Sequence, residues 1–474
     1  MAAVHRILLV VPPFPAAERY GKGIKDLAVT MPPMGLLYVA AYLEKHGYEV
    51  SILDCELEGL NLANAIGKIK EARPDLVGMT CLTPNFRRCN ALTSSIKKEI
   101  GVPVVYGGAH PTLLPEGTLR NSEVDYIVIG EGEVTFLELL NALNHDASPA
   151  RLSEIDGLAY RENGDIKVNP DRQVIQDINA LPLPARHLIR LERYRPGPQH
   201  YKELPFTTMI TSRGCPYRCI FCCTNKIWKR RYRQRTVPNV IEEIKFLQKE
   251  YGIREIGFWD DLWGLKDKWI IEFCDTVERE HLKFSWSCEL RVDTADFSIL
   301  QRMKRAGCWC IFYGAESLHQ ELLNNIQKDV KVEDIITTLQ NTKKAGIEIR
   351  ANFILGLPGE TPEMARNMIK MVNEMDPDYV KYNIFTPLPG SRSYEMATSG
   401  EWGEFTADYD RLTGYFPTFR PFGYESLDQL HEMRQAAHKS FYFRPRYILR
   451  KLRSIDNWSR LRSYTKAALA IMKS

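Results

Sequence analysis

Hydrophobic positions in the first third of the chain follow two alternating patterns. Apolar runs of strand length, typical of parallel strands covered on both faces, occur at residues 7–11, 48–54, 76–81, 102–108 and 124–130. Segments whose apolar residues recur with the helical period lie between them, at residues 35–47, 62–72 and about 90–100. Alternating strands and helices predict an α/β domain, a doubly wound parallel sheet over residues 1–145.

The pattern changes over residues 146–203, which we expect to form a linker. Residues 157–170 predict a hairpin there, because Asn163-Gly164 is a strong two-residue turn signal. The alternation resumes over residues 204–392 and predicts a partial (β/α)6 barrel, with strands at residues 206–212, 255–259, 284–290, 310–316, 349–356 and 379–385. Residues 393–474 are first aromatic and irregular, then mainly helical, and we expect them to cap the barrel.

Composition indicates a globular protein of two or three domains. The chain has 474 residues, 44% of them hydrophobic and 26% charged. No apolar run is long enough to cross a bilayer. The first apolar run leads into Pro12-Pro13 without a basic leader or a cleavage site, so it predicts a buried strand rather than a signal peptide. Eleven cysteines, an odd number, favour a reducing cytoplasm over a disulfide framework.

Three cysteines form the strongest chemical signal in the chain. Cys215, Cys219 and Cys222 have the spacing CxxxCxxC, which can hold three irons of a [4Fe–4S] cluster and leave the fourth iron open. The alternatives are a zinc site or a purely structural cluster. Zinc usually takes paired CxxC knuckles or Cys/His sets, and neither follows here. We expect Cys223, the next residue, to pack in the interior rather than bind iron.

This spacing, with the aromatic Phe221 before the last cysteine, resembles the radical S-adenosylmethionine (SAM) superfamily. The resemblance implies that SAM chelates the open iron and is cleaved by one electron to methionine and a 5′-deoxyadenosyl radical. It also places the SAM contacts at the carboxyl ends of the barrel strands. Each such residue taken singly could be a solvated strand end. The contacts implied are Phe221, Asp260, Asp261, Arg291, Glu316, Ser317, Asn352 and Gly356.

The carboxyl ends of the first-domain strands carry a second group of candidates, because ligands of doubly wound sheets bind there. They are Pro12, Pro13, Thr80, Thr83, Gly107, Gly108, His110, Pro111, Gly130, Glu131, Gly132 and Glu133. The strings PPMGLLYVAAYLEKHGYEV, GGAHPT and GEGE resemble the Rossmann-like cobalamin-binding domain of cobalamin-dependent radical SAM enzymes. The resemblance implies bound cobalamin.

The cobalamin prediction leaves alternatives open. No DxHxxG motif is present, so the resemblance implies cobalamin bound without a histidine from that motif, with His110 as a candidate contact at the corrin edge. The domain could instead serve only as a docking platform, since fold alone does not establish a ligand. In that case His110 is a surface or capping residue, and Glu131 and Glu133 are solvated.

Charge is unevenly distributed over the chain. The segment from Lys439 to Ser474 contains ten Lys and Arg residues and one acidic residue, whereas the whole chain has a net charge of +4. Such a basic, aromatic tail is typical of a helix on an anionic membrane, and the alternative is a helix docked on the barrel. A second basic run predicts a solvated loop, or a surface for an acidic reductase or an anionic substrate, and comprises Lys226, Lys229, Arg230, Arg231, Arg233 and Arg235. We expect Cys308 and Cys310 to be core residues rather than ligands of an extra cluster.

Two cofactors in one chain imply, by the resemblance, a methyltransferase that moves a methyl group from methylcobalamin to an unactivated carbon or phosphorus of a small-molecule or lipid-like substrate. Oxidative cyclisation, hydroxylation or ring rearrangement with the same cofactors are alternatives, as are methylthiolation and a non-enzymatic sensor. We expect an electron donor such as flavodoxin or ferredoxin, no nucleic acid, and a cytoplasmic protein whose tail contacts the inner membrane face.

Overall fold

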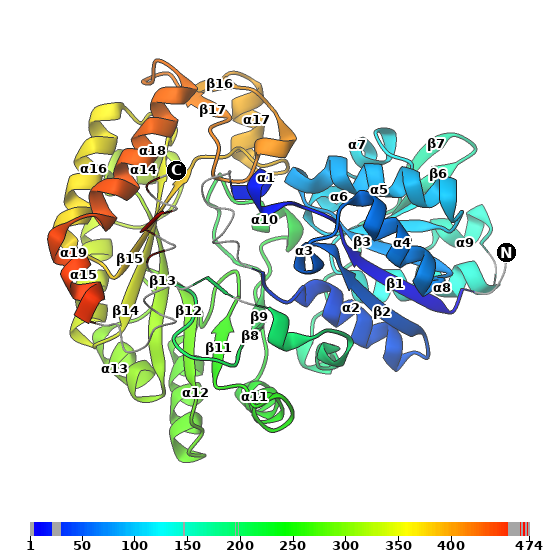
Figure 1. Ribbon diagram of the computed structural model, residues 1–474, viewed down its shortest axis with the longest axis horizontal. Helices are drawn as coiled ribbons and strands as arrows, with labels where there is room; N and C mark the ends of the chain where they lie inside the picture. The colour runs from blue at the N-terminus through cyan, green and yellow to red at the C-terminus, as the bar shows by residue number, and fades with distance from the viewer. Residues whose placement is uncertain are drawn as a thin grey trace. The chain divides into compact units, whose positions relative to one another are not determined.

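The structure is a computed structural model. It describes residues 4–20, 30–145, 147–194, 196–197 and 199–453, and the single positions 465, 468, 469 and 472. The chain divides into two compact units, each described below by itself (Figure 1). The first unit comprises Met1–Pro15, Pro32–Tyr194 and Lys226–Arg233, and the second comprises Ala16–Met31, Arg195–Asn225 and Gln234–Ser474. No helix in the described part of the chain is both long and apolar enough to span a membrane.

The first unit contains a seven-stranded sheet with the order β2-β1-β3-β4-β5-β6-β7. Its strands are β1 (Arg6–Val11), β2 (Glu49–Asp54), β3 (Leu76–Thr80), β4 (Val104–Gly107), β5 (Tyr126–Val128), β6 (Leu158–Glu162) and β7 (Asp165–Val168). The first five strands are parallel. This order reverses at β1 and places the carboxyl ends of the parallel strands at one edge, where doubly wound sheets bind ligands. The predicted doubly wound α/β sheet is confirmed.

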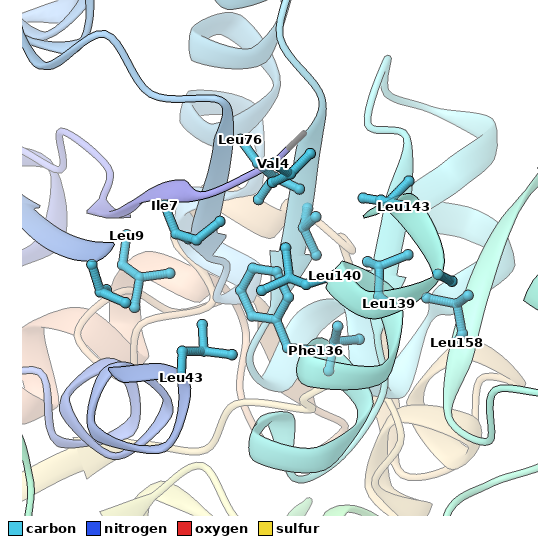
Figure 2. Packing of buried hydrophobic residues seen from close by; sticks show 14 of the residues in the cluster. Val4, Ile7, Leu9, Leu43, Leu76, Phe136, Leu139, Leu140, Leu143 and Leu158 are labelled. Carbon is cyan, nitrogen blue, oxygen red and sulfur yellow. The ribbon is translucent and has the colours of Figure 1, made fainter. Parts of the chain in front are cut away.

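Helices cover both faces of this sheet. They are α2 (Met34–Lys45), α3 (Cys55–Glu58), α4 (Leu62–Ala72), α5 (Phe86–Glu99), α6 (Ala109–Leu113), α7 (Pro115–Arg120), α8 (Gly132–His145) and α9 (Pro149–Ser153). Figure 2 shows Leu43 of α2 and Phe136 and Leu140 of α8 packed with Ile7 and Leu9 of β1. Because successive side chains point to opposite faces, the buried Leu8 and Val10 fill the other side.

The hairpin at Asn163-Gly164 has a different place from the one predicted. The turn forms as expected, with Asn163 in the left-handed region at φ 50°. Its strands, however, extend the first sheet: β6 pairs antiparallel with β5, and β7 with β6. The expectation of a spacer is therefore wrong for this segment, because the hairpin completes the sheet edge. Leu158 and Tyr160 of β6 also contribute to the core of the first unit.

The second unit contains a parallel six-stranded sheet with the order β15-β14-β13-β12-β11-β8, as predicted. The strands are β8 (Phe206–Met209), β11 (Glu255–Phe258), β12 (Ser285–Arg291), β13 (Cys308–Glu316), β14 (Glu348–Leu355) and β15 (Tyr379–Ile384). The helices after them are α11 (Val237–Tyr251), α12 (Asp267–Arg279), α13 (Phe297–Arg305), α14 (Gln320–Asn325), α15 (Val332–Lys344) and α16 (Pro362–Met375). A parallel βα array of this kind brings its reactive groups to the carboxyl ends of the strands.

The remaining described elements are short or lie near the carboxyl terminus. They are α1 (Ala16–Tyr20), β9 (Ser212–Arg213), α10 (Thr224–Ile227), β10 (Arg233–Gln234), α17 (Arg392–Thr398), β16 (Gly403–Phe405), β17 (Phe419–Pro421), α18 (Leu427–Tyr442) and α19 (Pro445–Arg453). Most of the basic tail beyond Arg453 lies outside the described residues.

Helix α18 closes the open edge of the second sheet with side chains. Three of them at four-residue spacing share one face of the helix and bind the backbone of the edge strand β15. Arg434 Nε donates to the Tyr382 carbonyl at 3.1 Å, and His438 Nε2 accepts from the Tyr382 amide at 3.3 Å. The Tyr442 hydroxyl donates to the Val380 carbonyl at 2.7 Å and accepts from its amide at 3.1 Å. An edge strand satisfied in this way cannot pair with another chain.

Candidate functional site

The loop that carries the three cysteines is fixed at its start by a buried carboxylate. Asp260, at the carboxyl end of β11, accepts from the Thr211 and Ser212 amides at 2.7 and 2.6 Å and from the Thr211 hydroxyl at 2.9 Å. Burial raises the pKa of Asp260 to about 7, although these three donors act in the opposite direction. The neighbouring Asp261 accepts from the Gly214 amide at 3.2 Å. Both acids therefore hold the backbone around the cysteines.

Cys215, Cys219 and Cys222 line one cavity of about 480 Å³ within the second unit. Cys223 does not line it, in agreement with the prediction that it packs elsewhere. In the described part of the chain no three His, Cys, Asp or Glu side chains converge on a single metal ion. A cluster of four irons is larger than one ion and takes one thiolate for each bound iron. Three thiols facing one cavity are a donor set that fits such a cluster.

Five of the eight expected SAM residues line the same cavity: Phe221, Asp261, Arg291, Glu316 and Asn352. The other three do not. Asp260 is turned into the backbone of the cluster loop, as described above. The Ser317 hydroxyl accepts from the His319 amide at 3.2 Å. Gly356 donates its amide to Glu360 at 2.6 Å, and a side chain at this glycine would meet Leu430. These three residues shape the loops around the cavity rather than its wall.

Arg291 is one of the expected SAM contacts, and its guanidinium offers two parallel donors. In the structure this fork is already used, because Nε and Nη2 donate to the two oxygens of Asp293 at 3.0 and 3.1 Å. Nη2 also donates to the Lys328 carbonyl at 2.9 Å, and the guanidinium lies 3.5 Å from the centroid of the Tyr217 ring. Arg291 therefore presents a flat, oriented cation to the cavity, with little free donor capacity.

Glu316 and Lys328 form a buried ion pair in the cavity wall, with 2.9 Å between Nζ and Oε1. Glu316 adopts φ +63°, which is uncommon for a residue with a side chain. A side chain at Gly314, two residues earlier, would meet the Glu316 carboxylate at 2.6 Å. The strained backbone and the glycine together aim the carboxylate into the cavity. Sequence reasoning missed Lys328, because it lies in a loop after α14 rather than at a strand end.

Several other cavity residues were also missed. They come from alternate positions along the strands, which face the inside of the barrel, and from the segment before β8. Period-two patterning on β12, β13, β14 and β15 could have found Glu289, Phe312, Arg350 and Lys381, and Trp259 directly follows β11. Nothing in the sequence indicates His200. The residues missed are Trp259, Glu289, Phe312, Arg350, Lys381 and His200.

The expected cobalamin residues lie at the carboxyl edge of the first sheet. Gly107 ends β4 and Gly130 follows β5, and a side chain at either glycine would meet nothing within 4 Å. Gly108 has φ +99°, and its missing side chain would come within 2.9 Å of the Cys81 carbonyl. The backbone is thus open at two strand ends and tight at the turn beside them. Bare backbone of this kind suits close approach by a flat ligand, so these residues fit cobalamin.

The remaining members of this set mostly have interior positions. Pro12, Pro13, Thr83 and Pro111 are buried, Thr80 and Gly132 are half-buried, and the Gly130 amide is held by the Thr112 hydroxyl at 3.0 Å. His110 is buried as well, with Nδ1 3.3 Å from the Thr83 hydroxyl and its ring 4.5 Å from that of Phe86. Burial lowers the pKa of His110 to about 4. His110 is therefore a neutral interior residue, and the alternative of a surface position is wrong.

Glu131 and Glu133 are buried too, so the alternative that they are solvated is wrong. Glu131 accepts from the Ile175 amide at 2.7 Å and pairs with Arg233 at 2.6 Å, with both side chains less than a tenth exposed. The second basic run is consequently not a plain solvated loop. Arg233 belongs to this buried pair, and Arg235 pairs with Glu243 in the interior of the second unit. Both arginines act within the fold rather than on a docking surface.

Known families match the two units. Residues 23–140 match the B12 binding domain, and residues 209–372 match the radical SAM superfamily. An uncharacterized methyltransferase of Pyrococcus horikoshii is 34% identical over 452 residues, which cover 95% of each chain. The anaerobic magnesium-protoporphyrin IX monomethyl ester cyclase of Rubrivivax gelatinosus is 30% identical over 82% of this chain and 69% of its own.

Solved structures show the same fold at low identity. The cobalamin-dependent S-adenosylmethionine radical enzyme OxsB, with aqua-cobalamin and S-adenosylmethionine bound, superposes with a TM-score of 0.74 at 18% identity, over 99% of this chain and 72% of its own. The radical S-adenosylmethionine methyltransferase TsrM of Kitasatospora setae, with cobalamin and a [4Fe–4S] cluster bound, gives 0.69 at 20% identity, over 90% and 85%. Two consecutive domains are thus shared in fold with proteins of this kind.

Proposed function

Because this chain belongs to the family of radical SAM enzymes with an N-terminal B12-binding domain, whose cofactors are a [4Fe–4S] cluster, SAM and cobalamin, we propose that it is a methyltransferase. The acceptor is an unactivated carbon or phosphorus of a small-molecule or lipid-like substrate. The observation that carries the proposal is the cavity on which Cys215, Cys219 and Cys222 converge with Glu316 and Lys328. The relative from Pyrococcus horikoshii, which covers 95% of this chain, is named an uncharacterized methyltransferase, and this supports the reaction type.

When bound, the cluster and cobalamin supply the electron that cleaves SAM and the methyl group that is transferred. The chain itself holds and orients these groups. The thiolates of Cys215, Cys219 and Cys222 would bind three irons of the cluster and would leave the fourth for SAM. Glu316 and Asp261 are the acceptors available to the SAM amino group, and Lys328 beside Arg291 supplies positive charge for its carboxylate. Phe221 and the buried aromatic wall limit water around a radical.

The test uses protein reconstituted anaerobically with iron, sulfide and cobalamin, and then reduced with dithionite or flavodoxin. We expect SAM to be cleaved to 5′-deoxyadenosine, and Cys219→Ala to abolish cleavage while Cys223→Ala retains it. With SAM carrying a CD3 group, we expect the label in cobalamin and then in the product, together with S-adenosylhomocysteine. Cleavage without any transfer of label to cobalamin would reject methyl transfer.

A second candidate function is oxidative cyclisation or hydroxylation with the same cofactors. It is favoured by the 30% identity to the magnesium-protoporphyrin cyclase of Rubrivivax gelatinosus. A putative methylthiotransferase of Methanocaldococcus jannaschii is 26% identical, which keeps methylthiolation as a third outcome. Product mass separates the three: a gain of CH2, a loss of hydrogen or gain of oxygen, or a gain of CH2S.

We also propose that the basic tail contacts an anionic membrane. The described part of it supports this: α19 exposes Ile448, Leu449 and Leu452 beside its basic residues. The test truncation must keep α18, because Tyr442 binds the edge of β15. A chain ending at Arg444, which keeps α18 and removes α19, should therefore sediment less with phosphatidylserine vesicles than the full chain does. Equal sedimentation would reject the contact.

A further inference from the structure

The cavity has a second, deeper level beneath the residues expected to bind SAM. The strand register aligns Arg291, Gly314, Asn352 and Lys381 in one inward-facing row. Two residues earlier along the same strands, Glu289, Phe312 and Arg350 form the next row. Two residues along a strand span about 6.6 Å, so this lower row is farther from the carboxyl edge where the cysteine loop lies. All of these residues line the cavity.

Arg350 in the lower row is a buried cation that has no carboxylate partner in the described part of the chain. The residue is 7% exposed, and its guanidinium contacts the His200 ring through Nη1 and lies 4.8 Å from the Phe312 ring centroid. Among the described residues, no Asp or Glu oxygen lies within ion-pairing distance of it, and its Nε has no hydrogen-bond partner. Burial lowers the pKa of His200 well below its ordinary value, so His200 is neutral. A buried cation without a counter-ion destabilises the folded protein unless a bound anion neutralises its charge.

Lys381 and Arg434 extend this positive region. Both lie 5.2 Å from the centroid of the Tyr415 ring, and neither forms an ion pair with an acid of the described chain. Burial raises the pKa of Tyr415, but the charges of Lys381, Arg350 and Arg434 outweigh it and leave that pKa below its ordinary value. Three acids of the described chain line the cavity, Asp261, Glu289 and Glu316, and Glu289 is the one in the same strand row as Arg350. Burial raises the pKa of its carboxyl, Arg350 and Lys381 oppose this, and Glu289 is ion-paired with neither.

The cations lie beside flat apolar walls. The His200 ring is 6.2 Å from that of Trp259 and 5.9 Å from that of Phe312, which it meets edge-on. Pockets that combine aromatic walls with a few convergent polar groups fix both the position and the orientation of a ligand. From this arrangement we infer that the lower level, together with Lys381 at the end of the upper row, binds the substrate, and that the substrate carries a carboxylate or phosphate held by Arg350 and Lys381 on a flat apolar body. The inference rests on the proposed function, since the cavity is taken as the place where substrate meets SAM.

The test measures charge preference by calorimetry, on protein loaded with cluster, cobalamin and saturating SAM but without reductant. The probes are 2-naphthoate, 2-naphthyl phosphate and the uncharged 2-naphthamide, which share one aromatic body. We expect at least one anion to bind at least tenfold more tightly than the amide, and the stronger anion indicates which group the substrate carries. Saturating SAM keeps the probes from Arg291 and Lys328, the cations assigned to SAM.

Single-residue variants test which cations cause the tighter binding of the anionic probes. Arg350→Met and Lys381→Met should each reduce it to less than threefold, and Arg350→Lys should restore part of it. Arg302→Met is the matched control, because Arg302 lies on α13 with its side chain 40% exposed, and pairs with Asp275 on the surface. Equal binding of anion and amide, no binding of any probe at 5 mM, or a preference that survives both Met variants would each overturn the inference. Formation of 5′-deoxyadenosine by the same preparations, after reduction, reports separately on the proposed function.

Discussion

Replacing Asp260 with Asn should change how the stability of the second unit depends on pH. The pKa of Asp260 is raised to about 7 by burial, from an ordinary value of 3.8. A carboxyl with a raised pKa binds its proton more tightly in the folded state. Ionisation of Asp260 therefore lowers the free energy of unfolding progressively as pH rises from about 4 to about 7, and the loss is constant above that range. The amide introduced by Asp260→Asn does not titrate, so the parent protein alone should lose this part of its stability.

The magnitude follows from the two pKa values. When the pH is raised from 5 to 8, the free energy of unfolding of the parent should fall by about 2.5 kcal/mol more than that of Asp260→Asn. Asn preserves the geometry, because its carbonyl can accept from the Thr211 and Ser212 amides, while its NH2 group faces the Thr211 hydroxyl, which can also accept. Stability at low pH should thus change little.

The assay is urea unfolding of parent and variant at pH 5 and pH 8, followed by tryptophan fluorescence. Contributions of the cluster and of the other acids cancel in the comparison. Asp275→Asn, at a half-exposed position on α12, is the control and should leave the pH difference unchanged. Curves for parent and Asp260→Asn that shift in parallel, within about 0.5 kcal/mol, would refute the reasoning. Asp260→Ala should in addition lower the iron content after reconstitution, because it leaves two buried amides unpaired.

Three further changes test other parts of the structure. Cys219→Ala should lose the cluster and its absorbance near 400 nm, whereas Cys223→Ala should keep both, as measured by iron analysis. Tyr442→Phe removes two hydrogen bonds from the edge of β15 and should cost about 1–3 kcal/mol in urea unfolding; an unchanged midpoint would contradict the role given to α18. Arg233→Met removes the buried cation that pairs with Glu131 and should cost about 3–5 kcal/mol. The double variant with Glu131→Gln should regain most of that loss, and additive losses would contradict the pairing.

Local sequence determined most of the secondary structure and the chemistry of the cluster loop. Apolar runs such as residues 7–11 and 76–81 are fully covered strands, and the two-residue turn at Asn163-Gly164 forms as predicted. Ligand spacing is also local, so the three cysteines could be recognised within one short stretch of the chain. These features depend on neighbours along the chain, which the sequence shows directly.

Tertiary structure alone decided where the hairpin pairs and which polar residues meet. Asp260 and Asp261 look equivalent in sequence and both bind backbone amides, yet of the two it is Asp261 that lines the cavity. Arg233 and Glu131 are separated by about a hundred residues, and Arg350 and His200 by a hundred and fifty. Such contacts depend on strand order and on which strand face is turned inward. Both are set by the packing of distant segments, so no local pattern could have shown that Arg350 has no acidic partner among the residues that the structure describes.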